Sequence, residues 1–303
     1  MTLNLETAAL MAEFAKSDGK PLEDMTPDEA RTLSRDLTSL GLLPDTSVTV
    51  TDSRLAVSGG DILLRTVTPA SAPIGVIVFF HGGGWVIGSA EEWESVASHL
   101  ATASGCTVVL PDYRKAPEHP FPTPVEDCWT ALTHIAQTTT LPLMVCGDSA
   151  GGNLAAVMAL RARDQNGPTL RGQILIYPVT DHDPQRPSWR AKDKQLILTA
   201  EGMTWFWDHY IAKAQDRLHP DASPLRAKSH DRLPPTFLLL AEHDILHDEG
   251  AAYADRLVAA GNDVTRTVSA GDTHGFLTLG SILPSATRAI AAMGVWVRQH
   301  LAK

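Results

Sequence analysis

Cysteine is scarce in this chain of 303 residues. The three cysteines, Cys106, Cys128 and Cys146, are odd in number and widely spaced, which argues against a disulfide framework and against a cysteine-based metal site. Two of them lie in apolar, strand-like runs. We therefore expect buried thiols in a reducing compartment.

Basic residues are in deficit, with 25 Lys and Arg against 35 Asp and Glu and a net charge of -10. No basic run is present, and phosphate binding needs such a cluster, so nucleic acid is not an expected partner. No apolar segment approaches the roughly 20 residues of a membrane span. The first residues also lack a basic region followed by an apolar stretch. We expect a cytoplasmic protein without a membrane span.

Hydrophobic residues make up 44% of the chain, enough for a sizeable core, and repeats and low-complexity tracts are absent. Apolar, strand-like runs alternate with helical segments, which predicts an α/β fold with a mostly parallel sheet. The runs lie at 74–80, 106–110, 143–146, 172–177, 236–241 and 264–268. A pair of antiparallel strands around a turn at 58–61 is expected before them.

Residues 1–45 predict two short helices. Thr26-Pro27-Asp28-Glu29 is typical of a helix start, because Thr26 can cap the helix, Pro27 suits its first position and Glu29 completes a capping box. Such a helical pair could cover a site or merely a sheet edge. A second irregular segment, from 180 to 219, interrupts the alternation where a lid would be expected.

The most informative stretch is Gly147-Asp148-Ser149-Ala150-Gly151, between a predicted strand and a predicted helix. Gly-x-Ser-x-Gly in this context is typical of a nucleophile elbow, in which small residues two before and two after the serine permit a strained turn that exposes the hydroxyl. The motif alone leaves open an ordinary turn in which Ser149 caps the helix.

A second informative stretch, His81-Gly82-Gly83-Gly84-Trp85, follows the first buried strand. Three glycines leave the backbone N–H groups free to face a cavity, which is how an oxyanion hole is built. A flexible loop or a phosphate-binding loop is the alternative, although no Gly-Lys-Ser/Thr follows. The serine downstream favours the oxyanion hole.

Asp244 and His274 each follow a later strand, and Gly275 permits the bend that would turn His274 inward. Because the carboxyl ends of parallel strands meet at one edge, we expect both residues beside Ser149 and the glycine loop. The order Ser, Asp, His is that of α/β hydrolases and differs from that of chymotrypsin-like and subtilisin-like proteases.

Other candidates are less suitable. Asp248 is the fallback acid, but its position favours a cap for the following helix, and Asp272 is too near His274 in sequence to reach its ring easily. His243 and His247 are interpreted as surface histidines or loop anchors. The aromatic residues at 205–207 are interpreted as packing residues in preference to substrate contacts.

Five segments together resemble the hormone-sensitive lipase family of bacterial carboxylesterases and lipases. They are 81–85, 112–122, 147–154, 222–225 and 274–276, and the match runs from about 74 to 276. Two positions depart from the family pattern. Ile245 stands where the family often has proline, and Lys115 stands where it often has leucine.

The resemblance implies an α/β-hydrolase fold. Residues 1–45 and an insertion at about 181–219 would form a helical cap, and 46–303 would be the catalytic domain. It also implies a catalytic triad and an oxyanion hole made of backbone N–H groups. The triad would be Ser149, Asp244 and His274, and the N–H groups would be those of Gly83, Gly84 and Ala150.

The reaction implied is hydrolysis of short- to medium-chain carboxylic esters through an acyl-enzyme, without metal or cofactor and frequently in a homodimer. A deacetylase or amidase for a specific small acylated metabolite is the alternative within the same chemistry. A non-catalytic small-molecule receptor on the same fold is the alternative from another class, and the presence of His274 argues against it.

Overall fold

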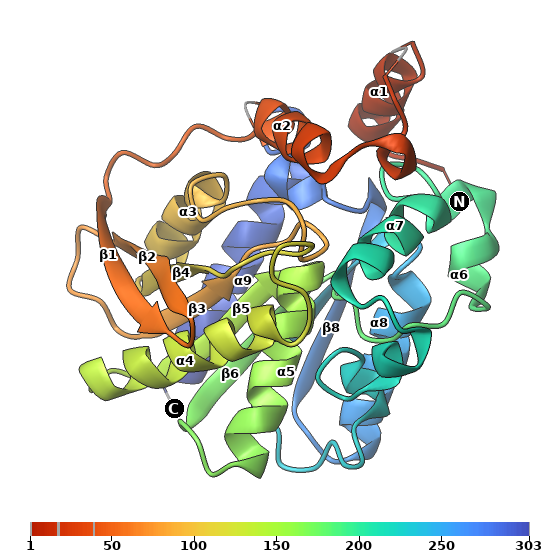
Figure 1. Cartoon of the computed structure of the whole chain (residues 1–303). Coiled ribbons are helices and arrows are strands. Elements are labelled where there is room, and N and C mark those ends of the chain that lie inside the picture. The colour runs from red at the N-terminus through yellow and green to blue at the C-terminus, as the bar shows by residue number, and fades with distance from the viewer. Residues whose placement is uncertain (1, 17–18, 39, 303) are drawn as a thin grey trace.

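The computed structural model describes residues 2–16, 19–38 and 40–302, so residues 1, 17, 18 and 39 of the predicted N-terminal segment and residue 303 lie outside it. Over the described residues, eight strands form one sheet in the order β1-β2-β4-β3-β5-β6-β7-β8 (Figure 1). The strands are β1 (Thr49–Val57), β2 (Gly60–Thr68), β3 (Val76–Phe80), β4 (Thr107–Asp112), β5 (Leu143–Asp148), β6 (Leu170–Ile176), β7 (Thr236–His243) and β8 (Val264–Thr273).

Helices cover both faces of this sheet (Figure 1). The α-helices are α1 (Leu5–Phe14), α2 (Pro27–Thr38), α3 (Glu94–Ser104), α4 (Thr123–Thr138), α5 (Ala150–Asp164), α6 (Pro187–Arg190), α7 (Ala200–Tyr210), α8 (His247–Ala259) and α9 (Ser285–Leu301). The short 3-10 helices are η1 (Leu22–Asp24), η2 (Lys192–Lys194), η3 (Ala214–Leu218), η4 (Pro224–Arg226) and η5 (Phe276–Thr278). Helices α3 and α9 pack in one apolar core, and α4, α5 and α8 pack in the other.

The predicted mostly parallel sheet is confirmed. Strands β3 to β8 pair in parallel, whereas β1 and β2 form the expected antiparallel pair and β2 runs antiparallel to β4. Every residue of β3, β5 and β7 is buried, as the continuous apolar runs in the sequence indicate for strands covered on both faces.

The predicted start of α2 is also confirmed. The backbone N–H of Thr26 donates to Glu29 Oε2 at 2.7 Å, and the N–H of Glu29 donates to Thr26 Oγ1 at 3.3 Å. These two bonds form a capping box, which satisfies N–H groups that a helix cannot pair internally. Helix α2 buries little of its surface, since Ala30 is its one buried residue.

The turn between β5 and α5 is strained at Ser149, whose φ is 54° and ψ is -119°. The residues two positions before and two positions after Ser149 must be glycine, because the backbone closes tightly there. A Cβ on Gly147 would overlap the carbonyl oxygen of Gly151, and a Cβ on Gly151 would overlap the carbonyl oxygen of Phe80. The turn thus holds α5 against the end of β3.

Some sequence expectations were wrong in detail. Helix α8 begins at His247, so Asp248 lies in its first turn and does not cap it. Of the two interpretations of His243, the surface one is wrong because the residue is buried, whereas the loop-anchor one fits the bond of its Nδ1 to the Asp193 carbonyl. The expectation of buried, unpaired thiols is confirmed for all three cysteines.

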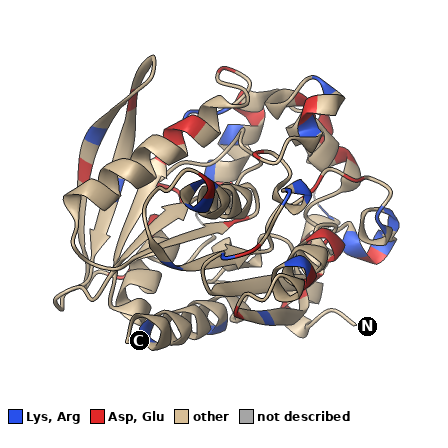
Figure 2. Cartoon of the chain, turned by 90° about the horizontal axis from the view of Figure 1, so that it is seen from below, with Lys and Arg blue, Asp and Glu red and all other residues tan. Residues whose placement is uncertain are grey.

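Charged residues of both signs are interspersed along the helices and loops (Figure 2). Within the described part of the chain, no helix is long and apolar enough to cross a membrane.

The elbow packing predicts a large difference between two Gly→Ala substitutions. Gly151→Ala forces Cβ into backbone, which no rotamer change relieves, and we expect it to lower the free energy of unfolding by more than about 3 kcal/mol or to prevent folding. Gly261→Ala is the matched control, because Gly261 has a φ of 81° but open space around it. There we expect a loss of about 1 kcal/mol. Urea unfolding of both variants measures the difference, and equal losses would contradict the packing argument.

Candidate active site

The sequence-predicted site residues meet at the carboxyl edge of the sheet. Ser149 follows β5, Asp244 follows β7 and His274 follows β8, while the loop His81–Gly84 follows β3. Since these strands run in parallel, their carboxyl ends present the four segments to one another.

Ser149, His274 and Asp244 form a continuous chain of hydrogen bonds. His274 Nε2 lies 2.9 Å from Ser149 Oγ, and His274 Nδ1 lies 2.7 Å from Asp244 Oδ2. A carboxylate only accepts, so Nδ1 carries the proton and Nε2 is free to accept the serine hydroxyl. Asp244 is 1% exposed, and its second oxygen accepts the N–H of Leu246 at 2.9 Å, which fixes its orientation.

The rejected candidates make other contacts. Asp248 Oδ2 accepts the N–H of Ser188 at 2.9 Å. Asp272 Oδ1 accepts from Asn4 Nδ2 at 2.8 Å and from two hydroxyl groups, which ties the start of α1 to the end of β8. His247 Nδ1 bonds to the Ala241 carbonyl, which makes it a loop anchor.

The ring of Tyr177 packs on His274, a contact that the sequence pattern did not reveal. The two ring centroids lie 4.7 Å apart with an interplanar angle of 57°. Tyr177 is fully buried and has a φ of 35°, an unfavourable value for a residue with a side chain. This packing restricts the movement of the imidazole ring.

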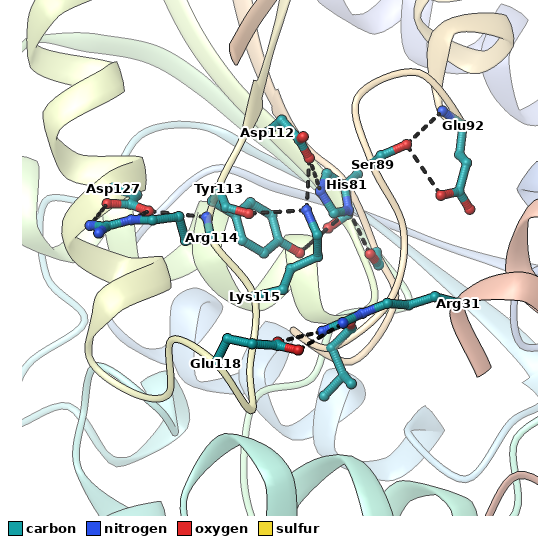
Figure 3. A network of polar contacts seen from close by, with 12 residues as sticks. Arg31, His81, Ser89, Glu92, Asp112, Tyr113, Arg114, Lys115, Glu118 and Asp127 are labelled. Carbon is teal, nitrogen blue, oxygen red and sulfur yellow. Dashed lines mark hydrogen bonds and ion pairs between the residues drawn. The ribbon is translucent and has the colours of Figure 1, made fainter. Parts of the chain in front are cut away.

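Polar side chains hold the glycine loop in one orientation (Figure 3). The carbonyl of His81 accepts from Tyr113 Oη at 2.8 Å, and the N–H of Gly82 in the same peptide donates to Asp148 Oδ1 at 2.9 Å. His81 Nδ1 then donates to the Gly82 carbonyl at 2.7 Å. In a trans peptide the carbonyl and the N–H point in opposite directions, so this bond also fixes the N–H of Gly83.

Several N–H groups remain available beside Ser149. Among the described residues, the N–H groups of Gly83 and Gly84 donate to no protein acceptor, and both glycines line the cavity that contains Ser149. Ala150 begins α5, where the first N–H groups of a helix have no partner within it. The arrangement can therefore accommodate negative charge on an oxygen next to the serine.

The imidazole of His81 is enclosed by aromatic and charged neighbours. The ring of Tyr113 stacks on it with centroids 4.3 Å apart. Asp112, which pairs with Lys115 at 2.8 Å, lies at the edge of the ring (Figure 3). Burial lowers the pKa of His81, which favours the neutral ring that donates from Nδ1. Lys115, where the resembling family often has leucine, thus neutralises the carboxylate beside this ring.

Asp148 is a buried carboxyl group within the elbow motif itself. Its Oδ1 accepts from the N–H of Gly82 and from Trp93 Nε1, the latter at 2.8 Å. Burial outweighs the hydrogen bonds from Trp93 and Gly82, and it raises the pKa of Asp148 to about 7. The motif leaves this position open to any residue, so sequence reasoning did not select it.

A cavity of about 240 Å³ opens beside Ser149 and His274, and its walls are mostly apolar. The N-terminal segment and the insertion after β6 both contribute to it. Their lining residues include Phe14, Leu22, Ala30, Leu33, Ser34, Leu37, Ile197, Leu198, Met203 and Phe206. Phe206 packs directly on Gly84, so the packing interpretation holds for its buried neighbours Trp205 and Trp207 but is incomplete for Phe206.

A metal site is not evident in the part of the chain that the structure describes, where no three His, Cys, Asp or Glu side chains group closely enough to hold an ion.

Known proteins of one family match this chain. A family model of the alpha/beta hydrolase fold matches residues 77–278. Ethyl acetate hydrolase of Pseudomonas putida is 34% identical over 99% of this chain and 100% of its own length. Carboxylesterase NlhH of Mycobacterium tuberculosis is 37% identical over 71% of this chain and 70% of its own length.

Solved structures give the same result. An ester hydrolase from the metagenome of Lake Arreo superposes with a TM-score of 0.94 at 34% identity and covers 100% of both chains. A thermostable esterase from Pseudomonas putida also has a TM-score of 0.94 at 34% identity, covering 99% of this chain and 98% of that one.

The chain belongs to the α/β hydrolase family, in the group related to hormone-sensitive lipase. It is a carboxylic-ester hydrolase, as are the relatives that match it along nearly their whole length.

The buried carboxyl group of Asp148 predicts a pH-dependent contribution to stability. Its pKa in the folded protein, about 7, lies above the ordinary value of 3.8. Folding therefore favours the protonated form, and this stabilisation is complete below about pH 4 and is lost as the pH rises through 7. Asp148→Asn mimics the neutral group and keeps an oxygen for both N–H donors.

We expect the free energy of unfolding of Asp148→Asn, relative to the wild type, to increase between pH 4 and pH 8. Urea titrations of both proteins across this range measure the difference. The other titrating groups are present in both proteins, so their contributions cancel in the difference between the two free energies of unfolding. A difference that does not change with pH would contradict the buried, proton-binding carboxyl group.

Proposed function

We propose that Ser149 is the nucleophile of ester hydrolysis, with His274 as general base and Asp244 as the residue that orients it. The observation that carries this proposal is the unbroken chain of hydrogen bonds from Ser149 Oγ to Asp244. A serine hydroxyl is a weak nucleophile until a base removes its proton, and a neutral Nε2 at 2.9 Å is placed to do so.

The steps follow from this geometry. Ser149 Oγ attacks the ester carbonyl while its proton passes to His274 Nε2, and Asp244 stabilises the imidazolium. The imidazolium then gives the proton to the departing alcohol, which leaves an acyl group on Ser149. Water, deprotonated by the same His274, attacks the acyl group and releases the carboxylic acid.

We propose the N–H groups of Gly83, Gly84 and Ala150 as donors to the oxyanion. Support comes from the two glycine N–H groups that lack protein acceptors and from the bond of His81 Nδ1 to the Gly82 carbonyl, which holds the next N–H in place. Donors fixed before the reaction need no reorganisation when charge develops, and each is worth on the order of 3 kcal/mol.

We propose that residues 1–45 and the insertion at about 181–219 act as a cap over a catalytic domain formed by 46–303. Helices of both segments line the cavity beside Ser149, and they touch each other where Trp205 Nε1 donates to the Met25 carbonyl at 3.2 Å. Closure by such a cap would exclude water from the acyl group and set the size of the substrate.

The proposed substrates are esters with short to medium acyl chains. The cavity is apolar but limited to about 240 Å³, and Phe206 on Gly84 restricts it next to the reacting carbon. The full-length relative named ethyl acetate hydrolase supports a small acyl group. An amide or a specific acetylated metabolite would use the same residues, but no feature of the cavity favours these over a simple ester.

The reducing cytoplasm is the proposed compartment, since the three thiols are buried and unpaired. A homodimer remains a proposal by analogy with the resembling family.

The nucleophile assignment predicts covalent labelling by a fluorophosphonate. We expect the wild type to gain one phosphonyl group, mapped to Ser149 by peptide mass spectrometry, and Ser149→Ala to gain none. His274→Ala should fold but lose about 10⁴-fold in kcat on p-nitrophenyl acetate. Ser281→Ala is a control serine outside the site, and we expect it to label like the wild type. A phosphonyl group on another residue would overturn the assignment.

The cavity predicts the acyl-chain preference. On p-nitrophenyl esters from acetate to palmitate, we expect kcat/KM to peak among the short to medium chains. Phe206→Ala removes the ring that packs on Gly84, and we expect the peak to move to longer chains because the cavity enlarges. Thr204→Ala, on an exposed position of the same helix, should keep the wild-type profile. A wild-type peak at palmitate would contradict the proposed substrate class.

A further inference from the structure

Arg31, on α2, makes hydrogen bonds with all five of its N–H groups. Its Nη1 and Nη2 bind the two carboxylate oxygens of Glu118 at 2.9 and 2.6 Å, and Nη1 also reaches Asp28 at 3.3 Å. Nε donates to the Val86 carbonyl and Nη2 to the Ala116 carbonyl, each at 3.0 Å. Figure 3 shows the side chain extended from its helix toward the loop that carries Glu118.

One carbonyl acceptor belongs to the turn that carries Gly83 and Gly84, and the other belongs to a loop that is bonded to this turn. Val86 lies in the turn that begins at Gly83, since its own N–H donates to the Gly83 carbonyl at 3.0 Å. Ala116 is joined to the same turn, because its N–H donates to the Trp85 carbonyl at 2.9 Å. The guanidinium therefore connects α2 to two loops that are already connected to each other.

Helix α2 depends on such polar contacts to stay in place. Ala30 is its one buried residue, and Leu33 is 39% exposed, so apolar burial holds the helix weakly. Ser34 Oγ donates to Glu92 Oε2 at 2.6 Å, and Thr38 Oγ1 reaches the same oxygen at 3.5 Å. Arg31 adds two backbone carbonyl groups and the Glu118 carboxylate to these contacts, so it is a major attachment of the helix.

The attachment matters for substrate because α2 forms one wall of the cavity. Ala30, Leu33, Ser34 and Leu37 line the space next to Ser149. The side chain of Arg31 is only 21% exposed, and bonding to it lowers the pKa of Glu118 to about 2, so the pair stays ionised at any pH used for ester assays.

We propose that Arg31 is a positioning residue that determines acyl specificity, by fixing the α2 wall of the cavity to the turn that carries the oxyanion donors. This inference rests on the proposed function and extends it to a residue outside the two glycine-containing motifs of the site. A long acyl chain reaches the α2 wall and depends on its position, whereas an acetyl group does not.

Arginine suits this role better than lysine. The planar guanidinium binds a carboxylate through two parallel bonds and still has donors for two carbonyl groups in fixed directions. A lysine ammonium keeps the positive charge but lacks the planar set of donors in fixed directions. It therefore cannot bond to α2, the glycine turn and the loop of Glu118 in the same geometry.

The test compares Arg31→Met with the wild type on p-nitrophenyl acetate and p-nitrophenyl octanoate. We expect kcat/KM for octanoate to fall by roughly tenfold or more, chiefly through KM, with a change below about threefold for acetate. Arg31→Lys should recover only part of the octanoate activity, and Glu118→Gln should lose part of it. Amide hydrogen exchange should accelerate in α2, at 27–38, but not in α5.

Arg161→Met is the matched control, because Arg161 also clamps two carboxylates, Glu126 at 2.8 Å and Asp221 at 2.7 Å, and does not line the cavity. We expect it to leave the ratio of octanoate to acetate activity unchanged. The proposal is overturned if Arg31→Met loses kcat/KM equally on both esters or loses none. It is also overturned if Arg161→Met changes the ratio of octanoate to acetate activity as Arg31→Met does. Turnover of acetate by the wild type tests the ester hydrolase function independently.

Discussion

The close approach of Gly151 to the Phe80 carbonyl is the constraint on which the site depends. No side chain fits between them, so the first turn of α5 lies directly against the end of β3. Strand β3 leads into the glycine loop, and α5 follows Ser149. The Ser149 hydroxyl and the N–H groups of the loop therefore belong to one closely packed unit.

Two buried carboxyl groups, those of Asp148 and Glu249, hold the segments around the site. Asp148 holds the glycine loop, and Glu249 holds the start of the insertion through the N–H groups of Thr180 and Asp181 and through Trp189. Burial raises the pKa of Glu249 to about 8. A buried carboxyl group is unfavourable unless such donors satisfy it, and its removal would leave several N–H groups unpaired.

Much of this arrangement could be predicted from the sequence because it is encoded locally. The capping box at Thr26 and Glu29, the Gly-x-Ser-x-Gly pattern and the apolar runs of the buried strands can each be recognised from residues close in the chain. The meeting of Ser149, Asp244 and His274 also followed, since parallel topology brings strand ends to one edge. Neither a tertiary contact nor a side-chain distance was needed for these conclusions.

What could not be predicted depends on contacts between distant segments. Arg31 meets Val86 and Glu118, 55 and 87 positions away, and nothing around it in the sequence signals these partners. Phe206 appears in an aromatic helix as an ordinary packing residue until its contact with Gly84 is known. His243 looked exposed among acidic neighbours, yet β7 extends through it and buries it.

Helix α2 buries little surface but lines the cavity. The residues that stabilise the fold are therefore largely different from those that shape the cavity. The sheet and its two apolar cores contain most of the buried side chains, whereas α2 contributes Ala30 to them and lines the cavity with several other side chains. Substitutions along that helix therefore change the cavity at little cost in folding free energy. Descendants of this chain could acquire new substrates through α2 while their catalytic centre is inherited unaltered.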